Sequence, residues 1–377
     1  MVTIFFKAVE KCNSNCIYCG VIKKQQNVIM KYGLLKEVLQ KINDYLLKYP
    51  EEEVNITWHG GEVCLLGAEY FFKAIDFLEK YCKTTKNRIK HLVQSNLTLI
   101  NQDIIDAFKI LGISNVGTSF EFIPHIRGFG KERNSMEYNK KFFEGVNLLE
   151  KNGMRWGVIY VVHKQSLKNP MEVFNMMTNL NVTSGPKFNK IYIYEEDKHN
   201  LSITGKEFAD FLGAILPFWW EHKDRFPNIP PLSQFYESYT RKITKMDCEL
   251  AGRCSHKWLY IGPTGNAFQC GRAGDFEILP YGNIKDQTLE ELLYNSQRDD
   301  VKNREAVLKD TECKDCRFWM VCHGGCPLDA MVAKGNIYKK ATHCDWVKPF
   351  LSEYFEPITQ LTLEKLTLKP IYYEPTH

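Results

Sequence analysis

The sequence predicts a parallel α/β fold for the first half of the chain. Short segments of strand type alternate with longer segments of helical periodicity over residues 2–194. Strands that alternate with helices are typical of β-α-β units, in which the strands run parallel. Cysteines, glycines and hydroxyl residues follow directly after several of the expected strands. A parallel sheet has its working loops beyond the carboxyl ends of its strands, so we expect one functional site at that edge.

The expected elements follow one another closely. The strands are apolar or alternating runs, and we place them at 2–9, 53–59, 91–95, 113–120, 156–162 and 191–194. The helices have apolar residues at helical spacing, and we place them at 32–48, about 68–83, 101–111, about 136–152 and 169–179. In the first helix, for example, the apolar positions are 34, 35, 38, 39, 42 and 46. A proline-rich stretch at 222–235 predicts a linker after these elements.

The composition is that of an ordinary globular protein. Of 377 residues, 44% are hydrophobic and 25% are charged, and 49 basic against 45 acidic residues give a net charge of +4. This balance favours neither a nucleic-acid nor a membrane partner, and we expect neither. No apolar run approaches the length of about 18 residues that a membrane span needs, and we expect no signal peptide.

The cysteine content indicates ligation rather than disulfides. Without an export signal, thirteen cysteines are better explained by metal or cluster binding in a reducing, anaerobic cytoplasm. Three of them, Cys12, Cys16 and Cys19, lie in one short loop directly after the strand at 2–9. A structural zinc site would normally show two pairs of ligands, and a complete iron–sulfur cluster needs four thiolates. The loop therefore predicts a four-iron cluster with one open iron; a metal clip or a group of buried thiols is the alternative.

With Tyr18 just before its last cysteine, this loop resembles that of the radical S-adenosylmethionine (radical SAM) enzymes. The resemblance implies that the open iron binds the amino and carboxylate groups of S-adenosylmethionine, whose cleavage releases a 5′-deoxyadenosyl radical. It also implies a partial (β/α)6 TIM-like barrel over residues 1–230, followed by a small irregular cysteine-rich domain. An external one-electron reductant, flavodoxin or ferredoxin, would supply the electron to a monomeric enzyme.

Further residues match the cofactor pocket of that family. Gly60-Gly61-Glu62, after the second expected strand, resembles the family's GGE element and implies contact with the ammonium group of the cofactor. Ser95 and Ser119, at the ends of the third and fourth strands, lie where the family contacts the ribose or methionine part, although either can be a turn former. Arg127 resembles an arginine that pairs with the cofactor carboxylate. Related enzymes often have Asp where this chain has Glu121.

A second cysteine array resembles the SPASM extension of peptide-modifying radical SAM enzymes. We expect a linker helix at 231–247, the array within 248–348, and a C-terminal helix and tail at 349–377. By analogy a first auxiliary [4Fe-4S] cluster is held by Cys248, Cys254, Cys270 and Cys326, and a second by Cys313, Cys316, Cys322 and Cys344. Eight thiolates suffice for two such clusters, which makes three in all. Two zinc sites are the alternative.

The spacing is similar to that of the anaerobic sulfatase-maturating enzymes, which oxidise Cys or Ser to formylglycine. Those enzymes are expected to have an aspartate base after the cysteine at 270, where this chain has Gly271. We therefore expect a maturase that installs a crosslink in a ribosomally made peptide, with formylglycine formation as the alternative. Residues that could serve as base or anchor cannot be ranked from sequence: Asp275, Glu277, His163, Glu195 and Arg272. A three-cluster electron carrier and a zinc-stabilised binding module are the hypotheses from other classes.

Overall fold

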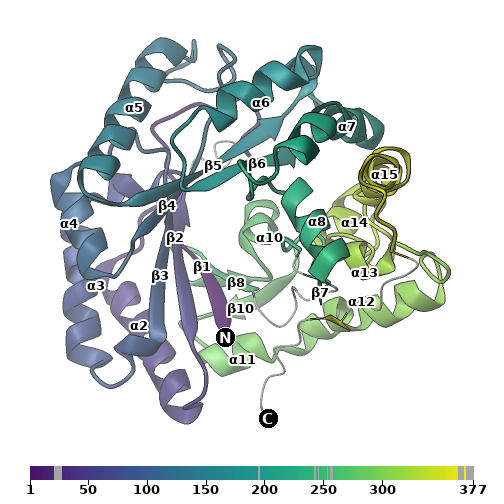
Figure 1. The fold of residues 1–377 in the computed structure, drawn as a ribbon. Helices are drawn as coiled ribbons and strands as arrows, with labels where there is room; N and C mark the ends of the chain where they lie inside the picture. Colours follow the sequence, from purple (N-terminus) through teal and green to yellow (C-terminus); the bar gives the residue numbers. More distant parts are fainter. Residues whose placement is uncertain are drawn as a thin grey trace. The chain divides into compact units, whose positions relative to one another are not determined.

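The structure, a computed structural model, describes residues 1–20, 28–193, 196–241, 243–244, 246–252, 254, 258–363 and 369–370. The chain forms two compact units (Figure 1). The first contains Met1–Gly157 and Ser255–Asp299, and the second contains Val158–Cys254 and Asp300–Glu374. Among the described residues, no helix is long and apolar enough to cross a membrane.

The first unit is built on a sheet whose central strands are parallel. Strand β1 pairs in parallel with β2 on one side and with β8 on the other, and β3 and β4 continue the parallel order. At the other edge, β9 and β10 are antiparallel, giving the order β10-β9-β8-β1-β2-β3-β4. The bounds are β1 (Val2–Val9), β2 (Val54–Gly60), β3 (Ile89–Gln94), β4 (Asn115–Ser119), β8 (Trp258–Ile261), β9 (Asn266–Phe268) and β10 (Pro280–Asn283).

Helices cover one face of this sheet. They are α2 (Tyr32–Lys48), α3 (Gly67–Tyr81), α4 (Gln102–Ile110) and α5 (Ser135–Lys151), and Figure 1 shows them along one side of the strands. Phe6 of β1 meets Trp58 of β2 at 5.1 Å, and Trp58 meets Phe71 of α3 at 5.3 Å between ring centroids. Because successive side chains of a strand point to opposite faces, Phe5 and Lys7 face away from these helices.

The last part of the first unit packs against β1, because β8 pairs with that strand. After β8 and β9 comes the short helix α10 (Gly271–Phe276), and α11 (Leu289–Leu293) follows β10. Thr288 caps α11 with a capping box, in which its hydroxyl accepts from the Glu291 amide and the Glu291 carboxylate accepts from Thr288. Gly274 packs so closely that a Cβ there would lie 2.8 Å from the Tyr260 ring, which fixes α10 against β8.

The second unit is mostly helical. Its strand β6 neighbours β5 (Arg155–Val162), which begins in the first unit. Aromatic side chains form its core, with Trp346 packed edge-on against Phe208 at 5.1 Å. The elements are α6 (Pro170–Thr178), β6 (Ser184–Lys190), α7 (Gly205–Glu221), α8 (Leu232–Arg241), β7 (Ile243–Thr244), α12 (Asp299–Asp310), α13 (Trp319–Cys322), α14 (Pro327–Lys334), α15 (Cys344–Pro349), the π-helix η5 (Phe350–Phe355), α16 (Glu356–Thr359) and β11 (Lys369–Pro370).

Most of the predicted elements are confirmed. The first five strands and all five helices lie within two residues of their expected bounds, and β1 and α2 coincide with them. Residues 222–231 join α7 to α8 within the second unit, and their role as a linker between domains stays a prediction.

The sixth strand was placed wrongly. It is Ser184–Lys190, whereas 191–193 form no strand and residue 194 lies outside the described residues. Ile191-Tyr192-Ile193 has high intrinsic β-propensity, but tertiary contacts override it here. The buried Phe188 packs on Phe211 and donates its amide hydrogen to the Pro230 carbonyl at 3.0 Å.

Candidate active site

The loop after β1 brings two of its thiols around one hydroxyl group. Ser14 Oγ lies 3.2 Å from Cys12 Sγ and 3.7 Å from Cys16 Sγ, and the Ser14 amide donates to Cys12 Sγ at 3.4 Å. Neither these thiols nor that of Cys19 is in a disulfide. Burial raises the pKa of Cys12 and Cys16, so both are neutral until a metal replaces the proton. This donor set fits the predicted iron–sulfur cluster.

Backbone hydrogen bonds hold the loop in place on one side. The Asn15 amide donates to the Gly128 carbonyl at 2.8 Å, and the Ile17 amide donates to the Ile126 carbonyl at 2.9 Å. Both acceptors belong to the segment between β4 and α5. The cysteine loop and the segment that contains Arg127 therefore form one structure.

Gly60-Gly61-Glu62 holds the loop on the other side. The Gly61 amide donates to the Val9 carbonyl at 3.1 Å, and the Glu62 amide donates to the Lys11 carbonyl at 2.9 Å. A Cβ on Gly61 would lie 2.3 Å from the Lys11 carbonyl oxygen. Glycine is therefore required because the end of β2 approaches the cysteine loop backbone to backbone.

The carboxylate of Glu62 ties together three segments and is fully buried. Its Oε1 accepts from the Cys64 amide at 2.9 Å and from Ser95 Oγ at 2.7 Å, and its Oε2 accepts from the Asn96 amide at 2.6 Å. Burial raises the pKa of Glu62, and these hydrogen bonds oppose the rise. Of the predicted cofactor contacts, Glu62 and Ser95 thus meet each other, and their contact to the cofactor stays a prediction.

A buried ion pair supports Tyr18, the residue between the last two cysteines of the loop. Tyr18 donates its hydroxyl hydrogen to Glu121 Oε1 at 2.7 Å, and Arg127 Nε donates to Glu121 Oε2 at 2.9 Å. Arg127 also donates to Tyr18 at 2.6 Å and to Tyr138 at 3.2 Å. Burial alone would lower the pKa of Arg127, but Cys16 and Glu121 outweigh it and raise that pKa. Contact between Arg127 and the cofactor stays a prediction.

We expect Glu121→Gln to destabilise the protein by about 3–5 kcal/mol, because it leaves the Arg127 guanidinium buried without a counter-charge. Arg127 is 7% exposed and Glu121 2%. Urea unfolding of the purified protein measures the change. Glu132→Gln, on an exposed residue of the same segment, is the control and should stay within about 0.5 kcal/mol of wild type. Equal stability of the two variants would contradict the support that we assign to this pair.

A ring of amides and hydroxyls also joins the loop to the end of β3. Asn96 donates to Asn13 Oδ1 at 2.9 Å, Asn13 donates to Thr98 Oγ1 at 2.8 Å, and Thr98 donates to Asn96 Oδ1 at 2.8 Å. Sequence reasoning missed this ring, although polar residues directly after a strand were its signal. The half-buried Ser119 lies apart from it and accepts from Gln94 Nε2 at 3.5 Å.

The second unit contains a cavity of about 510 Å³ at the second cysteine array. Three of the four ligands predicted for the second auxiliary cluster line it, namely Cys313, Cys316 and Cys344. The fourth, Cys322, is buried, and burial with the neighbouring thiol of Cys344 raises its pKa to about 12. A cavity lined by thiols suits a cluster, but among the described residues no three His, Cys, Asp or Glu side chains are grouped to hold a single metal ion.

Arg304 of α12 binds backbone carbonyls of two segments that lie between the cysteines of this array. Its guanidinium donates to the carbonyls of Ile337 at 2.6 Å, Gly324 at 2.8 Å, and Gly325 and Lys339 at 2.9 Å. Two of these carbonyls lie between Cys322 and Cys326, and two precede Cys344. The buried guanidinium thus links the two segments through their backbone carbonyls.

We expect Arg304→Met to lower the iron content of the purified protein and to destabilise it by several kcal/mol, because each orphaned carbonyl costs about 1–3 kcal/mol. Iron analysis and urea unfolding measure the two effects. Lys309→Met removes an exposed basic side chain from the same helix and should change neither. Wild-type iron content and stability in Arg304→Met would refute the role of the guanidinium.

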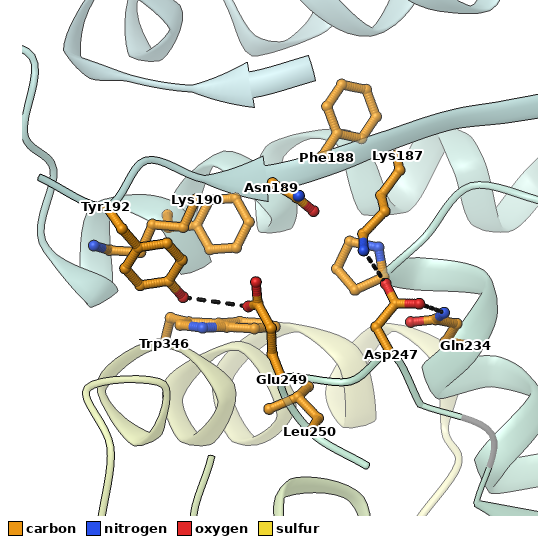
Figure 2. A pocket seen from close by; sticks show the side chains of 12 residues that line it. Lys187, Phe188, Asn189, Lys190, Tyr192, Gln234, Asp247, Glu249, Leu250 and Trp346 are labelled. Atoms are coloured by element: carbon orange, nitrogen blue, oxygen red, sulfur yellow. Dashed lines mark hydrogen bonds and ion pairs between the residues drawn. The ribbon is translucent and has the colours of Figure 1, made fainter. Parts of the chain in front are cut away.

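A pocket in the second unit surrounds the residues on both sides of Cys248 (Figure 2). Lys187 pairs with Asp247, to which Gln234 also donates at 2.8 Å. Glu249 accepts from Tyr192 at 3.5 Å and lies 2.8 Å from the buried His343. The cavity measures about 30 Å³, which is about the volume of one water molecule. The pocket therefore has space for about one water molecule and not for a larger ligand.

The other predicted residues fall in both units. Cys270 belongs to the first unit, as do Arg272, Asp275 and Glu277, whereas Cys248, Cys254 and Cys326 belong to the second. His163 is fully buried in the second unit, and Glu195 lies outside the described residues. The assignment of these cysteines to a first auxiliary cluster stays a prediction.

Comparison with known proteins agrees with this geometry. Residues 7–177, which include the cysteine loop, Glu62 and Arg127, match the model of the Radical SAM superfamily. The chain therefore contains a radical SAM domain over these residues. The match begins within β1 and ends in α6, so it covers the parallel strands that are typical of the radical SAM partial barrel. The cysteine-rich remainder is consistent with a SPASM-like domain.

Similarity to known proteins extends beyond this domain over most of the chain. The serine-type anaerobic sulfatase-maturating enzyme of Bacteroides thetaiotaomicron is 25% identical over 348 residues, covering 84% of this chain and 80% of its own. The solved structure of native anSMEcpe with bound AdoMet and Cp18Cys peptide has a TM-score of 0.80 at 21% identity, and covers 95% of this chain and 98% of its own. The solved structure of Streptococcus suis SuiB bound to precursor peptide SuiA has a TM-score of 0.58 at 15% identity. The match covers 91% of this chain and 75% of the SuiB chain. The two structures show that the fold is shared.

Proposed function

We propose that this radical SAM maturase removes a hydrogen atom from a side chain of a ribosomally made peptide and installs a crosslink there. The observation that carries the radical step is the loop of Cys12, Cys16 and Cys19, held between Gly61 and the segment of Arg127. The similar sulfatase-maturating enzyme, anSMEcpe with its Cp18Cys peptide, and SuiB with its precursor peptide support a peptide substrate.

The residues of the loop have separate tasks. When bound, a [4Fe-4S] cluster on Cys12, Cys16 and Cys19 and S-adenosylmethionine would supply the 5′-deoxyadenosyl radical. Ser14 is placed to hydrogen-bond the thiolate of Cys12, and Glu121 with Arg127 fixes Tyr18 beside Cys19. Gly60, Gly61 and Glu62 keep the end of β2 against the loop, where the ammonium group of the cofactor is expected. Ser95 and Ser119 are proposed to contact the remaining parts of the cofactor. We also propose that the cysteine-rich part holds two further clusters. Flavodoxin or ferredoxin would supply the electron as external reductant.

Gly271 favours a crosslink over formylglycine as the product. A Cβ there would lie 3.8 Å from the Phe5 ring, an ordinary van der Waals distance, and the backbone does not require glycine. A Cβ therefore fits at 271, so neither backbone conformation nor packing at the Cβ requires glycine there. Formylglycine formation remains the second candidate because the sulfatase-maturating enzyme of Bacteroides thetaiotaomicron matches 84% of the chain.

The test begins with anaerobically purified protein. We expect roughly twelve irons per chain, from three four-iron clusters, and reductant-dependent release of 5′-deoxyadenosine. A pooled library of synthetic peptides, with Cys, Ser, aromatic and aliphatic residues at varied positions, is then analysed by mass spectrometry. A crosslink appears as loss of a pair of hydrogen atoms, whereas formylglycine from Cys requires loss of sulfur and gain of oxygen. Zinc as the bound metal, or no 5′-deoxyadenosine, would refute the proposal.

A further inference from the structure

A group of ionisable side chains lies on the face of the sheet that is turned away from α3 and α4. Lys7 of β1 and His59 of β2 are partners in the strand register, each one residue beyond the helix-facing Phe6 and Trp58. Lys7 forms an ion pair with Asp275 of α10 and lies 5.8 Å from the centre of the Tyr260 ring of β8. All these residues belong to the first unit.

Helix α10 aligns its residues with those of β1. Position 271 faces Phe5 and position 275 faces Lys7. Four residues of a helix advance about 6 Å and two residues of a strand advance about 6.6 Å, so the two contacts lie one above the other. Asp275 therefore occupies the same helix face as Gly271, one turn further along.

The same helix also reaches the cysteine loop. A Cβ on Gly20, the residue directly after Cys19, would lie 3.9 Å from Cζ of Phe276. Phe276 is the neighbour of Asp275 in the chain, so α10, the helix that carries Asp275, lies against the residue that follows the last cysteine of the loop. The ion pair therefore belongs to a helix that contacts the cysteine loop.

Asp275 is the member of this group that can accept a proton. His59 Nδ1 already accepts from the Gly60 amide at 2.8 Å, and burial together with the Lys7 charge lowers the pKa of His59 to about 4. Tyr260 donates to Glu10 at 3.4 Å, and burial raises its pKa. Lys7 is a cation with 5% of its side chain exposed, whereas the Asp275 side chain is 19% exposed. Lys7 bonds to Oδ1, and among the described residues none donates to Oδ2.

We propose that Asp275 accepts the proton that the peptide substrate loses during bond formation, and that Lys7 positions its carboxylate. The inference rests on the proposed function. After a hydrogen atom has left the substrate carbon, forming the new bond requires the loss of one electron and one proton. An oxidised iron–sulfur cluster held by the cysteines of the second array would take up the electron. The proton passes from the attacking heteroatom or ring carbon to Oδ2 of Asp275.

Stability alone gives little reason for this ion pair, in which Lys7 is buried and Asp275 is partly exposed. A buried ion pair contributes little net stability, because desolvation of both charges offsets their attraction, and apolar residues of similar size often serve as well. Phe5, Trp258 and the Tyr260 ring provide an apolar surface on this face of the sheet, which a further apolar side chain would continue. The retention of two charges there fits a task in catalysis, and the missing carboxylate at 271 leaves that task to Asp275.

Asp275→Asn tests the inference with the library peptide that wild-type enzyme modifies. We expect product formation to fall about a hundredfold or more, as on loss of a general base, while 5′-deoxyadenosine release continues. Lys7→Met should behave similarly, and Lys7→Arg should recover part of the product. Gly271→Asp in the Asp275→Asn background should also recover product, because the added Cβ meets only ordinary van der Waals contacts and the new carboxylate lies on the same helix face. Asp286→Asn, on an exposed residue of the same unit, is the control and should match wild type.

Other outcomes would overturn the inference. Wild-type product formation in Asp275→Asn would remove Asp275 from the reaction. A parallel fall in product, 5′-deoxyadenosine and iron content would give the pair a structural role instead. Either result leaves the proposed function intact, whereas a wild-type enzyme that releases 5′-deoxyadenosine but modifies no library peptide would overturn both.

Discussion

Replacing Cys12, Cys16 and Cys19 together with alanine is expected to abolish reductant-dependent release of 5′-deoxyadenosine. The three thiols are the proposed ligands of the only cluster with an open iron, and no other thiol in the loop can replace them. Iron content should fall from roughly twelve to roughly eight per chain, because the two clusters of the second array remain. Liquid chromatography of the released nucleoside and iron analysis measure the two effects.

The matched control for this variant is Cys82→Ala. Cys82 is fully buried in the same unit, where its thiol donates to the Leu39 carbonyl at 3.4 Å. It belongs to neither cysteine array, so its loss should leave iron content and nucleoside release unchanged. Continued release of 5′-deoxyadenosine by the triple variant would show that the radical does not originate at this loop.

Local signals explain why so much of the fold was predictable. The strand at 2–9 and the helix at 32–48 are decided by the periodicity of their own residues, and the structure reproduces both. The cysteine loop is likewise a local pattern. The sixth strand failed because Ser184–Lys190 contains Gly185 and Pro186, and its place depends on contacts with Pro230 and Phe211 that no local pattern records.

The parts of the site that were not predictable depend on pairs of distant residues. The sequence alone assigns no structural role to the Glu121 carboxylate. Its role as the acceptor for Tyr18, which is 103 positions away in the chain, is seen only in the fold. Lys7 and Asp275 are 268 positions apart, and neither residue alone differs from a surface charge in the sequence. Residue type and spacing can therefore predict candidate ligands of a cluster, whereas the partners of charged side chains become apparent only in the fold.

Gly61→Ala is expected to have the second large effect, because the cysteine loop depends on a backbone contact that leaves no room for a side chain. A methyl group on Gly61 would lie 2.3 Å from the Lys11 carbonyl oxygen and 2.6 Å from that of Glu10. Backbone atoms cannot rotate away as a side chain can, so the end of β2 or the loop must shift. Overpacking of this kind costs about 1–3 kcal/mol, and the shift also weakens the amide bonds from Gly61 and Glu62 to the loop.

The expected result is a fall in 5′-deoxyadenosine release of about tenfold to a hundredfold, since each 1.4 kcal/mol corresponds to a factor of about ten. Gly33→Ala is the matched control, because no atom lies within 4 Å of its added methyl group and its φ is not positive. Within α2, that change should leave release unchanged and should stabilise the protein by up to about 1 kcal/mol. Wild-type release by Gly61→Ala would show that the loop tolerates displacement. The glycine pair would then act on the cofactor directly, and not through the position of the loop.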